Sequence, residues 1–289
     1  MRIIHKRLVF IACLLVSVPL ARSQMPGRPE TSVIDLAQKQ IKTYLSKLAD
    51  VHCTETVVQE KLAENGHVEA SAKEQFDYLI MMSGHEDDFQ MSESRIETPG
   101  WRHKLLSTPM LLTNGMATAL LVFDPYYRSS FNFQALPEEQ IDGRPAIPIH
   151  FAHIAGRRTP AALALRGREY PLELEGTAWL DKNSGEIVKV DATLLHDMSD
   201  IGLHSLKIHV EYKPMKLGTD ASQIMMPALA VVDVTSARQH WRNTHFFGNY
   251  RSFSADVEQD PHVTIHPDNA DPEGTPRPAM PPSNPKENP

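Results

Sequence analysis

The sequence lacks an apolar run long enough to cross a bilayer as a helix, which takes about 20 residues. The N-terminal run Leu8–Val18 has eleven residues and is interrupted by Ser17. A membrane-spanning helix is therefore not expected. The short run belongs instead to a three-part pattern at the N-terminus.

That pattern is typical of a secretory signal peptide. Basic residues at Arg2, Lys6 and Arg7 precede the run, and small residues at Ala21 and Ser23 suit cleavage between Ser23 and Gln24. Residues 1–23 are thus predicted to be a leader, and the protein to be exported, either periplasmic or secreted. The alternative is a lipoprotein-type cut before Cys13, which would leave five apolar residues ahead of the cysteine.

Cysteine is nearly absent. The chain has Cys13 and Cys53, and loss of the leader leaves Cys53 alone. No internal disulfide can then form, so packing must hold the core. Cys53 has no base close to it in sequence, and a buried apolar thiol is the expectation.

Basic residues are in the minority. The chain has 29 Lys and Arg against 36 Asp and Glu, a formal charge of −7. Removing the four basic residues of the leader leaves 25 against 36, or −11. Nucleic-acid binding depends on a basic surface, so no nucleic-acid partner is expected.

Catalytic signatures are missing as well. The sequence contains no Gly-x-Ser-x-Gly elbow, no His-Glu-x-x-His and no phosphate loop. His150 and His153 could suggest a metal pair, but in a strand residues three apart point to opposite faces, whereas zinc needs convergent ligands. We therefore expect no enzyme, no metal and no cofactor, with an unrecognised hydrolase as the last alternative.

The C-terminus is rich in proline. Residues 257–289 contain nine prolines and no aromatic residue, a composition that cannot bury enough apolar surface to offset the entropy of ordering. We predict a disordered tail at 257–289 and a single domain at 24–256.

Within that domain, apolar residues recur at helical spacing from Val33 to Leu48, and Ser32 followed by Asp35 suggests a capped start. A second short helix is predicted at 114–123. Nearly everything else alternates or is β-branched, and the short turns leave no room for a βαβ rhythm. The prediction is class α+β, an antiparallel sheet of about ten strands: 53–62, 74–82, 89–97, 128–136, 146–154, 171–181, 185–195, 203–212, 228–236 and 239–247.

The stretch Gly176–Val190 reads as a hairpin. A three-residue turn at 183–185, with Gly185 left-handed, would pair Leu180 with Val188 and Ala178 with Val190. These four residues then share an apolar face, and we predict that they contact a ligand. Trp179 and Lys189 pair on the other face, as a structural cross-strand pair or, alternatively, as a ligand contact.

Two further stretches are candidate sites. In the strand 239–247, Trp241, Asn243, His245 and Phe247 share one face. This strand either seals the edge of the sheet or forms a cavity mouth where Arg242 or His245 meets a ligand headgroup. Around "TPAALAL" (159–165), the flanking arginines form a solvated loop or touch anionic lipid; they are Arg157, Arg158, Arg166 and Arg168.

An ordered series of segments resembles exported proteins with the LolA-like fold, the periplasmic lipoprotein carriers and their regulatory relatives. The segments are "EQFDYLIMMSGHEDDFQMSESRIE", "MATALLVFDPYYRSSFNF", "IDGRPAIPIHFAHI", "GTAWLDKNSGEIVKVDA" and "QHWRNTHFFGNYRSF". The resemblance implies a strongly curved half-barrel with a long N-terminal helix and short helices on its concave side. It assigns no acyl-binding residue to a position of this sequence.

What the resemblance implies about function is a non-enzymatic carrier that binds an acyl lipid or lipoprotein on the concave face. The alternative is an envelope sensor or interaction module that binds a protein partner. Both use the same sheet, so no residue pattern separates them. Peripheral membrane contact is expected only at the arginine-flanked loop.

Overall fold

The computed structural model describes residues 29–48, 51–83, 90–97, 113, 115–165, 167–216 and 223–252. All of them belong to one compact unit, residues 1–253. The predicted leader and the predicted Pro-rich tail lie outside the described residues, and both stay predictions.

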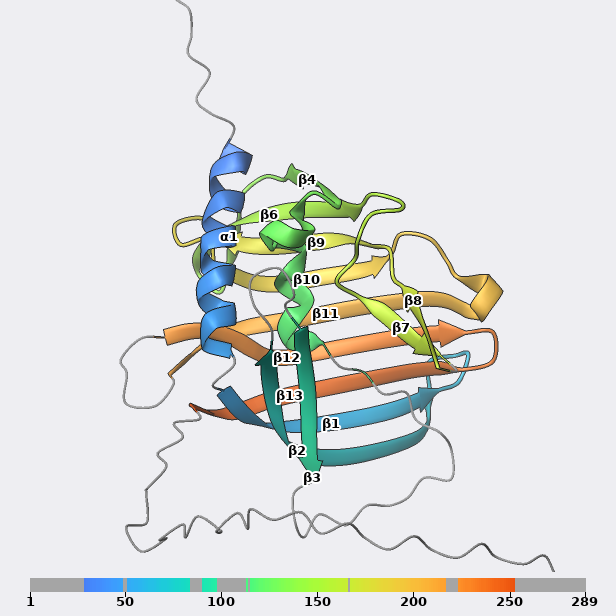
Figure 1. Ribbon diagram of the computed structural model, residues 1–289. Helices are drawn as coiled ribbons and strands as arrows, with labels where there is room; N and C mark the ends of the chain where they lie inside the picture. The colour runs from blue at the N-terminus through green and yellow to red at the C-terminus, as the bar shows by residue number, and fades with distance from the viewer. Residues whose placement is uncertain are drawn as a thin grey trace, which may run out of the picture. The chain divides into compact units, whose positions relative to one another are not determined.

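A single open sheet dominates the described chain (Figure 1). Its strands pair antiparallel in the order β3-β2-β1-β13-β12-β11-β10-β9-β6-β4, with β5 added beside β6. Their bounds are β1 Val51–Leu62, β2 Val68–Ser83, β3 Gln90–Glu97, β4 Phe131–Ala135, β5 Glu139–Ile141, β6 Arg144–His153, β9 Leu174–Asp181, β10 Ile187–Leu194, β11 Leu203–Lys216, β12 Gln223–Ser236 and β13 His240–Ser252. The predicted α+β class and its curved, open antiparallel sheet are confirmed.

The expected strands are found, and the structure adds three short ones. These are β5 and the two strands of a separate hairpin, β7 (Ala162–Leu165) and β8 (Arg168–Pro171). In Figure 1 this hairpin stands in front of the sheet, on the same side as helix α1. The segment predicted as a basic loop is therefore a small two-stranded element.

Helix α1 (Pro29–Leu48) crosses the strands on the concave side (Figure 1). It already includes Pro29, so the predicted capped start at Ser32 is wrong. Its apolar stripe, which includes Ala37, Ile41 and Tyr44, is buried. The predicted helix 114–123 is a 3₁₀ helix, η1 (Met116–Phe123). It ends at Asp124, whose carboxylate accepts from the Tyr126 N–H and starts the short helix α2 (Pro125–Arg128). A second 3₁₀ turn, η2 (Ser199–Ile201), precedes β11.

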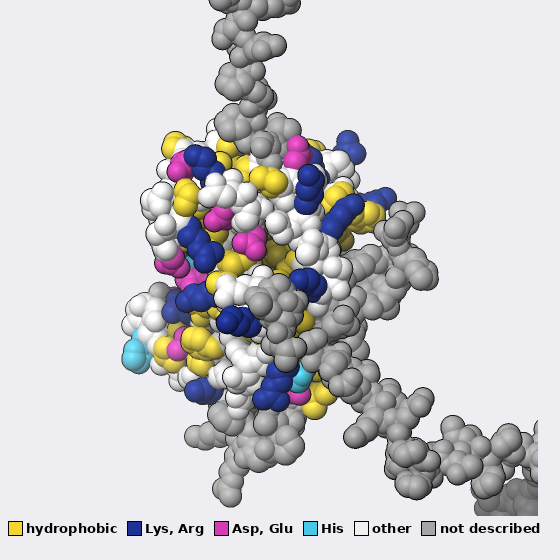
Figure 2. Space-filling model, turned by 90° about the vertical axis from the view of Figure 1, so that its left-hand side faces the viewer, with side chains coloured by type: hydrophobic (Ala, Val, Ile, Leu, Met, Phe, Trp, Pro, Cys, Tyr) yellow, Lys and Arg dark blue, Asp and Glu magenta, His cyan; other side chains and the backbone are white. Residues whose placement is uncertain are grey.

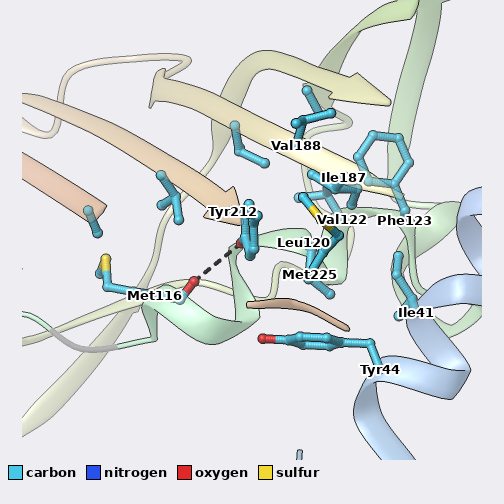
Figure 3. Close-up of a cluster of buried hydrophobic side chains, with 14 of the residues drawn as sticks. Ile41, Tyr44, Met116, Leu120, Val122, Phe123, Ile187, Val188, Tyr212 and Met225 are labelled. Atoms are coloured by element: carbon cyan, nitrogen blue, oxygen red, sulfur yellow. Dashed lines mark hydrogen bonds between the residues drawn. The ribbon is translucent and has the colours of Figure 1, made fainter. Parts of the chain in front are cut away.

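The core forms where α1 and η1 meet the concave face (Figure 3). Ile41 and Tyr44 from α1 lie against Leu120 and Val122 from η1 and against side chains of β10, β11 and β12. The Tyr212 hydroxyl donates to the Met116 carbonyl at 3.3 Å, which ties η1 to β11 (Figure 3).

The β9–β10 hairpin differs from its prediction near the turn. Ala178 faces Val190 and Trp179 faces Lys189 as predicted, but Leu180 pairs with Ile187 rather than Val188. The reason is a four-residue turn closed by the Asp181 N–H donating to the Glu186 carbonyl at 2.8 Å. The register shift between Ile187 and Lys189 absorbs the extra residue as a bulge, and it leaves both Ile187 and Val188 buried.

Candidate functional site

The concave face holds a cavity of about 210 Å³. Its floor consists of the inward-pointing residues of β9 to β12. Side chains alternate between the two faces of each strand, and those on this face are apolar. Its sides are η1 and the β7–β8 hairpin. The residues that line it include Met116, Ala119, Val122, Phe151, Pro160, Ala161, Leu163, Leu172, Leu174, Val190, Leu206, Val232 and Val234.

The β7–β8 hairpin covers the cavity without joining the main sheet. Its base is closed by two hydrogen bonds: the Leu172 N–H donates to the Ala161 carbonyl at 2.9 Å, and the Thr159 hydroxyl donates to the Leu172 carbonyl at 2.7 Å. An isolated two-stranded hairpin is marginally stable by itself. Its position therefore depends on the apolar contacts that Ala161 and Leu163 make with the core.

A buried polar cluster lies at one end of the cavity. Glu55 on β1 is fully buried and its carboxylate accepts two hydrogen bonds from the Arg95 guanidinium on β3, one of them 2.8 Å long. His245 on β13 is also buried, and its Nδ1 lies 2.8 Å from the same carboxylate. The charges of Glu55 and Arg95 are thus paired inside the protein rather than by solvent.

The cluster holds the segment that leads into η1. The Thr113 carbonyl accepts from Arg95 at 3.0 Å, and the Thr113 hydroxyl accepts from the Asn243 amide at 3.0 Å and contacts His245 Nε2. The Gly115 N–H donates to the Glu93 carboxylate at 2.8 Å. Since Thr113 and Gly115 also line the cavity, side chains from β1, β3 and β13 set one wall of it.

The two carboxylates of the cluster have opposite pKa shifts. Burial by itself would raise the pKa of Glu55, but the hydrogen bonds and charges of Arg95 and His245 outweigh burial and lower it. For Glu93, burial dominates and raises the pKa, against the lowering effect of the Gly115 N–H and Arg95. Burial would lower the pKa of Arg95, yet its bond to Glu55 raises it. Glu55 and Arg95 are therefore held as an ion pair.

What this arrangement offers a ligand is mainly apolar contact. The cavity wall is mostly hydrocarbon, and the hydroxyl of Thr113 is bonded to the cluster behind that wall. Within the described ranges, no group of three or more His, Cys, Asp or Glu side chains is placed to hold a metal ion. No helix in the same ranges has the length and apolar character to span a membrane.

Known protein families and characterised protein sequences provide no match to this chain. Solved structures do. A DUF1329 family protein from Desulfovibrio piger is 12% identical, with 80% of this chain and 94% of that chain covered and a TM-score of 0.44. A putative outer membrane lipoprotein-sorting protein domain from Vibrio parahaemolyticus is 12% identical, with 78% and 94% covered and a TM-score of 0.40. A LolA superfamily protein from Nitrosomonas europaea is 10% identical, with 76% and 92% covered and a TM-score of 0.34.

The chain resembles LolA-like proteins. Solved LolA-like structures are thus among those to which the chain is similar.

Of the four hairpin residues predicted to contact a ligand, one lines the cavity and three pack in the core behind it. Val190 lines the cavity. Ala178 and Leu180 are fully buried and Val188 nearly so, and all three belong to the core cluster that supports the wall. The structure thus places one of the four at the cavity itself.

The two residues predicted at a cavity mouth point to opposite faces of β13. His245 is on the inner face within the polar cluster. Arg242 is on the outer face, where its Nε lies 3.2 Å from the Asp233 carboxylate, which also contacts His240. The same outer face carries Trp179, whose ring lies 3.7 Å from the Lys189 ammonium and whose N–H donates to Glu139. The cross-strand pairing of Trp179 and Lys189 is confirmed.

The arginines predicted to contact a membrane belong to the hairpin and the segment before it. Arg157 and Arg158 precede β7 and are exposed, and Arg168 begins β8 and is exposed. Arg166 lies outside the described residues. His150 and His153 lie on opposite faces as predicted: His150 borders an outer groove and His153 is buried beside Phe131.

Sequence reasoning missed Glu55, Glu93, Arg95 and Thr113. One signal for Glu55 was available: along β1 every second residue is buried, and Glu55 is one of these, between Cys53 and Val57. A carboxylate in that phase needs a buried partner. Nothing local identifies the partner, because Arg95 and His245 reach Glu55 only through the pairing of β1 with its neighbours in the sheet.

Proposed function

We propose that this protein is an exported, non-enzymatic carrier that binds one acyl chain of a lipid or lipoprotein in the concave cavity. The observation that carries the proposal is the cavity itself, which is lined mainly by apolar side chains of β9 to β12, η1 and the β7–β8 hairpin. Burying hydrocarbon in such a site gains about 0.8 kcal/mol per methylene.

The volume of the cavity limits which kinds of ligand can fit. Sites for drug-sized ligands have volumes of roughly 300–1,000 Å³, and this one has about 210 Å³. A single slender chain suits that volume better than a ring system or several chains. The polar headgroup would stay outside, because the polar side chains at the Thr113 end are already bonded to one another.

Displacement of a fluorescent fatty-acid analogue tests the proposal. Uptake by the processed protein should be saturable, and longer fatty acids should displace the analogue better until the cavity is full. Val234→Trp, which fills the cavity from β12, should weaken uptake. Val231→Trp on the outer side of the same strand is the matched control and should not.

Circular dichroism must show that both variants keep the sheet, because overpacking alone can disturb a core. Absence of saturable uptake by the unaltered protein would overturn the carrier proposal. Equal weakening by both tryptophans would contradict the assignment of this cavity as the site.

A further inference from the structure

An exposed group of aromatic and basic side chains lies next to the cavity, and we name Tyr126, Arg157 and Arg158 the basic–aromatic patch. The Arg158 guanidinium lies 4.6 Å from the centre of the Tyr126 ring. Tyr126 is 50% exposed, although it stacks edge-on with Tyr127 at 4.9 Å. The Tyr126 ring and the Arg158 guanidinium are thus presented to solvent together, and the preceding residue, Arg157, is also exposed.

The arginines of the patch differ from others in the domain. Arg95, Arg128 and Arg242 each lie within ion-pair distance of a carboxylate. No carboxylate of the described residues lies within ion-pair distance of Arg157 or Arg158. Their charge is therefore directed outward, in a chain whose formal charge is −7.

The backbone of the patch is fixed in place. The Arg157 N–H donates to the Ile154 carbonyl at 3.1 Å, and the Arg158 carbonyl lies 3.1 Å from Nε2 of the buried His153. The chain then enters the cavity wall at Pro160 and Ala161. The two arginines of the patch and the cavity wall are consecutive parts of one segment, so whatever binds these arginines comes close to the cavity.

We propose that the basic–aromatic patch is the surface by which this protein contacts an anionic phospholipid bilayer. Each basic residue at such a surface contributes about a fivefold gain in partitioning, and tyrosine suits the boundary between headgroups and hydrocarbon. On the face shown in Figure 2, Lys and Arg side chains lie among Asp and Glu side chains. The acidic remainder of the chain is repelled, which orients the patch toward the lipid.

The exposed tyrosine and the neighbouring apolar cavity favour a bilayer over an acidic protein as the partner. Arg168, at the start of β8, is a further exposed cation at the turn end of the hairpin. The purpose of the contact, delivery or collection of an acyl chain, rests on the proposed function; the contact itself does not.

Co-sedimentation of the processed protein with vesicles tests the proposal. Vesicles of equal parts phosphatidylglycerol and phosphatidylcholine should bind it at low salt, and pure phosphatidylcholine vesicles should not. Arg157→Gln combined with Arg158→Gln should lower partitioning about thirtyfold. Lys207→Gln combined with Lys213→Gln removes the same charge from two exposed positions of β11 and should leave partitioning nearly unchanged.

Tyr126→Ser should weaken binding at both low and high salt, because it removes the apolar part of the contact. Equal loss in the arginine and lysine pairs would overturn the proposal, since net charge alone would then explain binding. Binding to an acidic protein without binding to vesicles would overturn it too. Acyl uptake is measured separately in vesicle-free solution: if uptake fails while vesicle binding holds, the carrier proposal falls and the membrane contact stands.

Discussion

Nδ1 of His245 lies 2.8 Å from the carboxylate of Glu55, across the pairing of the first and last strands of the domain. The two residues are 190 positions apart in the sequence. Because Arg95 holds the same carboxylate from β3, one buried anion joins three strands and, through Thr113, the start of η1. This cluster fixes one end of the cavity.

Removing the anion should be costly. Glu55→Gln should lower the free energy of unfolding by about 3–5 kcal/mol, because it leaves the buried Arg95 guanidinium without its counter-ion. Glu60→Gln on the outer phase of β1 should cost less than about 1 kcal/mol. Urea titration gives both values. Arg95→Met should cost much less in the Glu55→Gln background than in the unaltered protein; equal costs would mean that the pair is not coupled.

The pH dependence of stability should differ in sign for the two carboxylates. The pKa of Glu55 is lowered on folding, so its stabilising contribution is present above the ordinary glutamate value of 4.5 and is lost as pH falls through the folded-state pKa. The pKa of Glu93 is raised, so its contribution is present below that value and is lost as pH rises through the folded-state pKa.

Glutamine variants separate these two effects in urea titrations from acid to neutral pH. The deficit of Glu55→Gln relative to the unaltered protein should shrink on acidification. The free energy of unfolding of Glu93→Gln should increase relative to that of the unaltered protein as pH rises. Parallel pH profiles of the two differences would contradict the assigned shifts.

The bulge in β10 predicts which positions tolerate charge. Val188→Asp should cost several kcal/mol, since it buries an unpaired carboxylate in the core. Lys189→Gln should cost about 0.5–1 kcal/mol, the size of its cation–π contact with Trp179. Comparable losses in a denaturant titration would show that the two side chains do not face opposite sides.

Gly185 should be more sensitive than an ordinary left-handed turn glycine. Gly185 and Gly143 both have positive φ, 75° and 77°. A Cβ at Gly143 would meet nothing, whereas one at Gly185 would lie 2.5 Å from the Leu36 Cβ and 2.7 Å from the Ala37 N of α1.

Alanine at either position destabilises the protein by roughly 1–2 kcal/mol, because a residue with a Cβ is disfavoured in the left-handed region. Only Gly185→Ala must also displace the helix α1. The melting midpoint should therefore fall further for Gly185→Ala than for Gly143→Ala, and hydrogen exchange in α1 should accelerate. Equal shifts would mean that α1 does not rest on the hairpin turn.

Cys53 should be unreactive in the folded protein. It is buried, and burial raises the pKa of its thiol to about 12, so almost no thiolate exists at mildly alkaline pH. In a chain carrying Cys13→Ser, a thiol reagent should modify Cys53 only at the rate of unfolding, and should do so at once in denaturant. Rapid reaction without denaturant would place Cys53 at the surface.

The period-2 alternation of the chain determined the strands and their faces. Apolar partners recur two residues apart along β9 and β10, so Ala178 and Val190 had to share a buried face, and Trp179 and Lys189 the other. The long helix was equally local, since its apolar stripe returns every three or four residues. Both signals lie within a few residues of each other in the chain, which is why the class and the sheet could be predicted.

Tertiary structure alone decided the site. The cavity exists because η1 and the β7–β8 hairpin, which have weak local signals, come to lie over strands whose sequence positions are far away. Likewise, the buried phase of β1 indicated that Glu55 needs a partner, but the pairing of β1 with β13 selected His245. Such contacts depend on which strands become neighbours and how the sheet curves, and the free energy that decides this is summed over the whole core rather than encoded in any one segment.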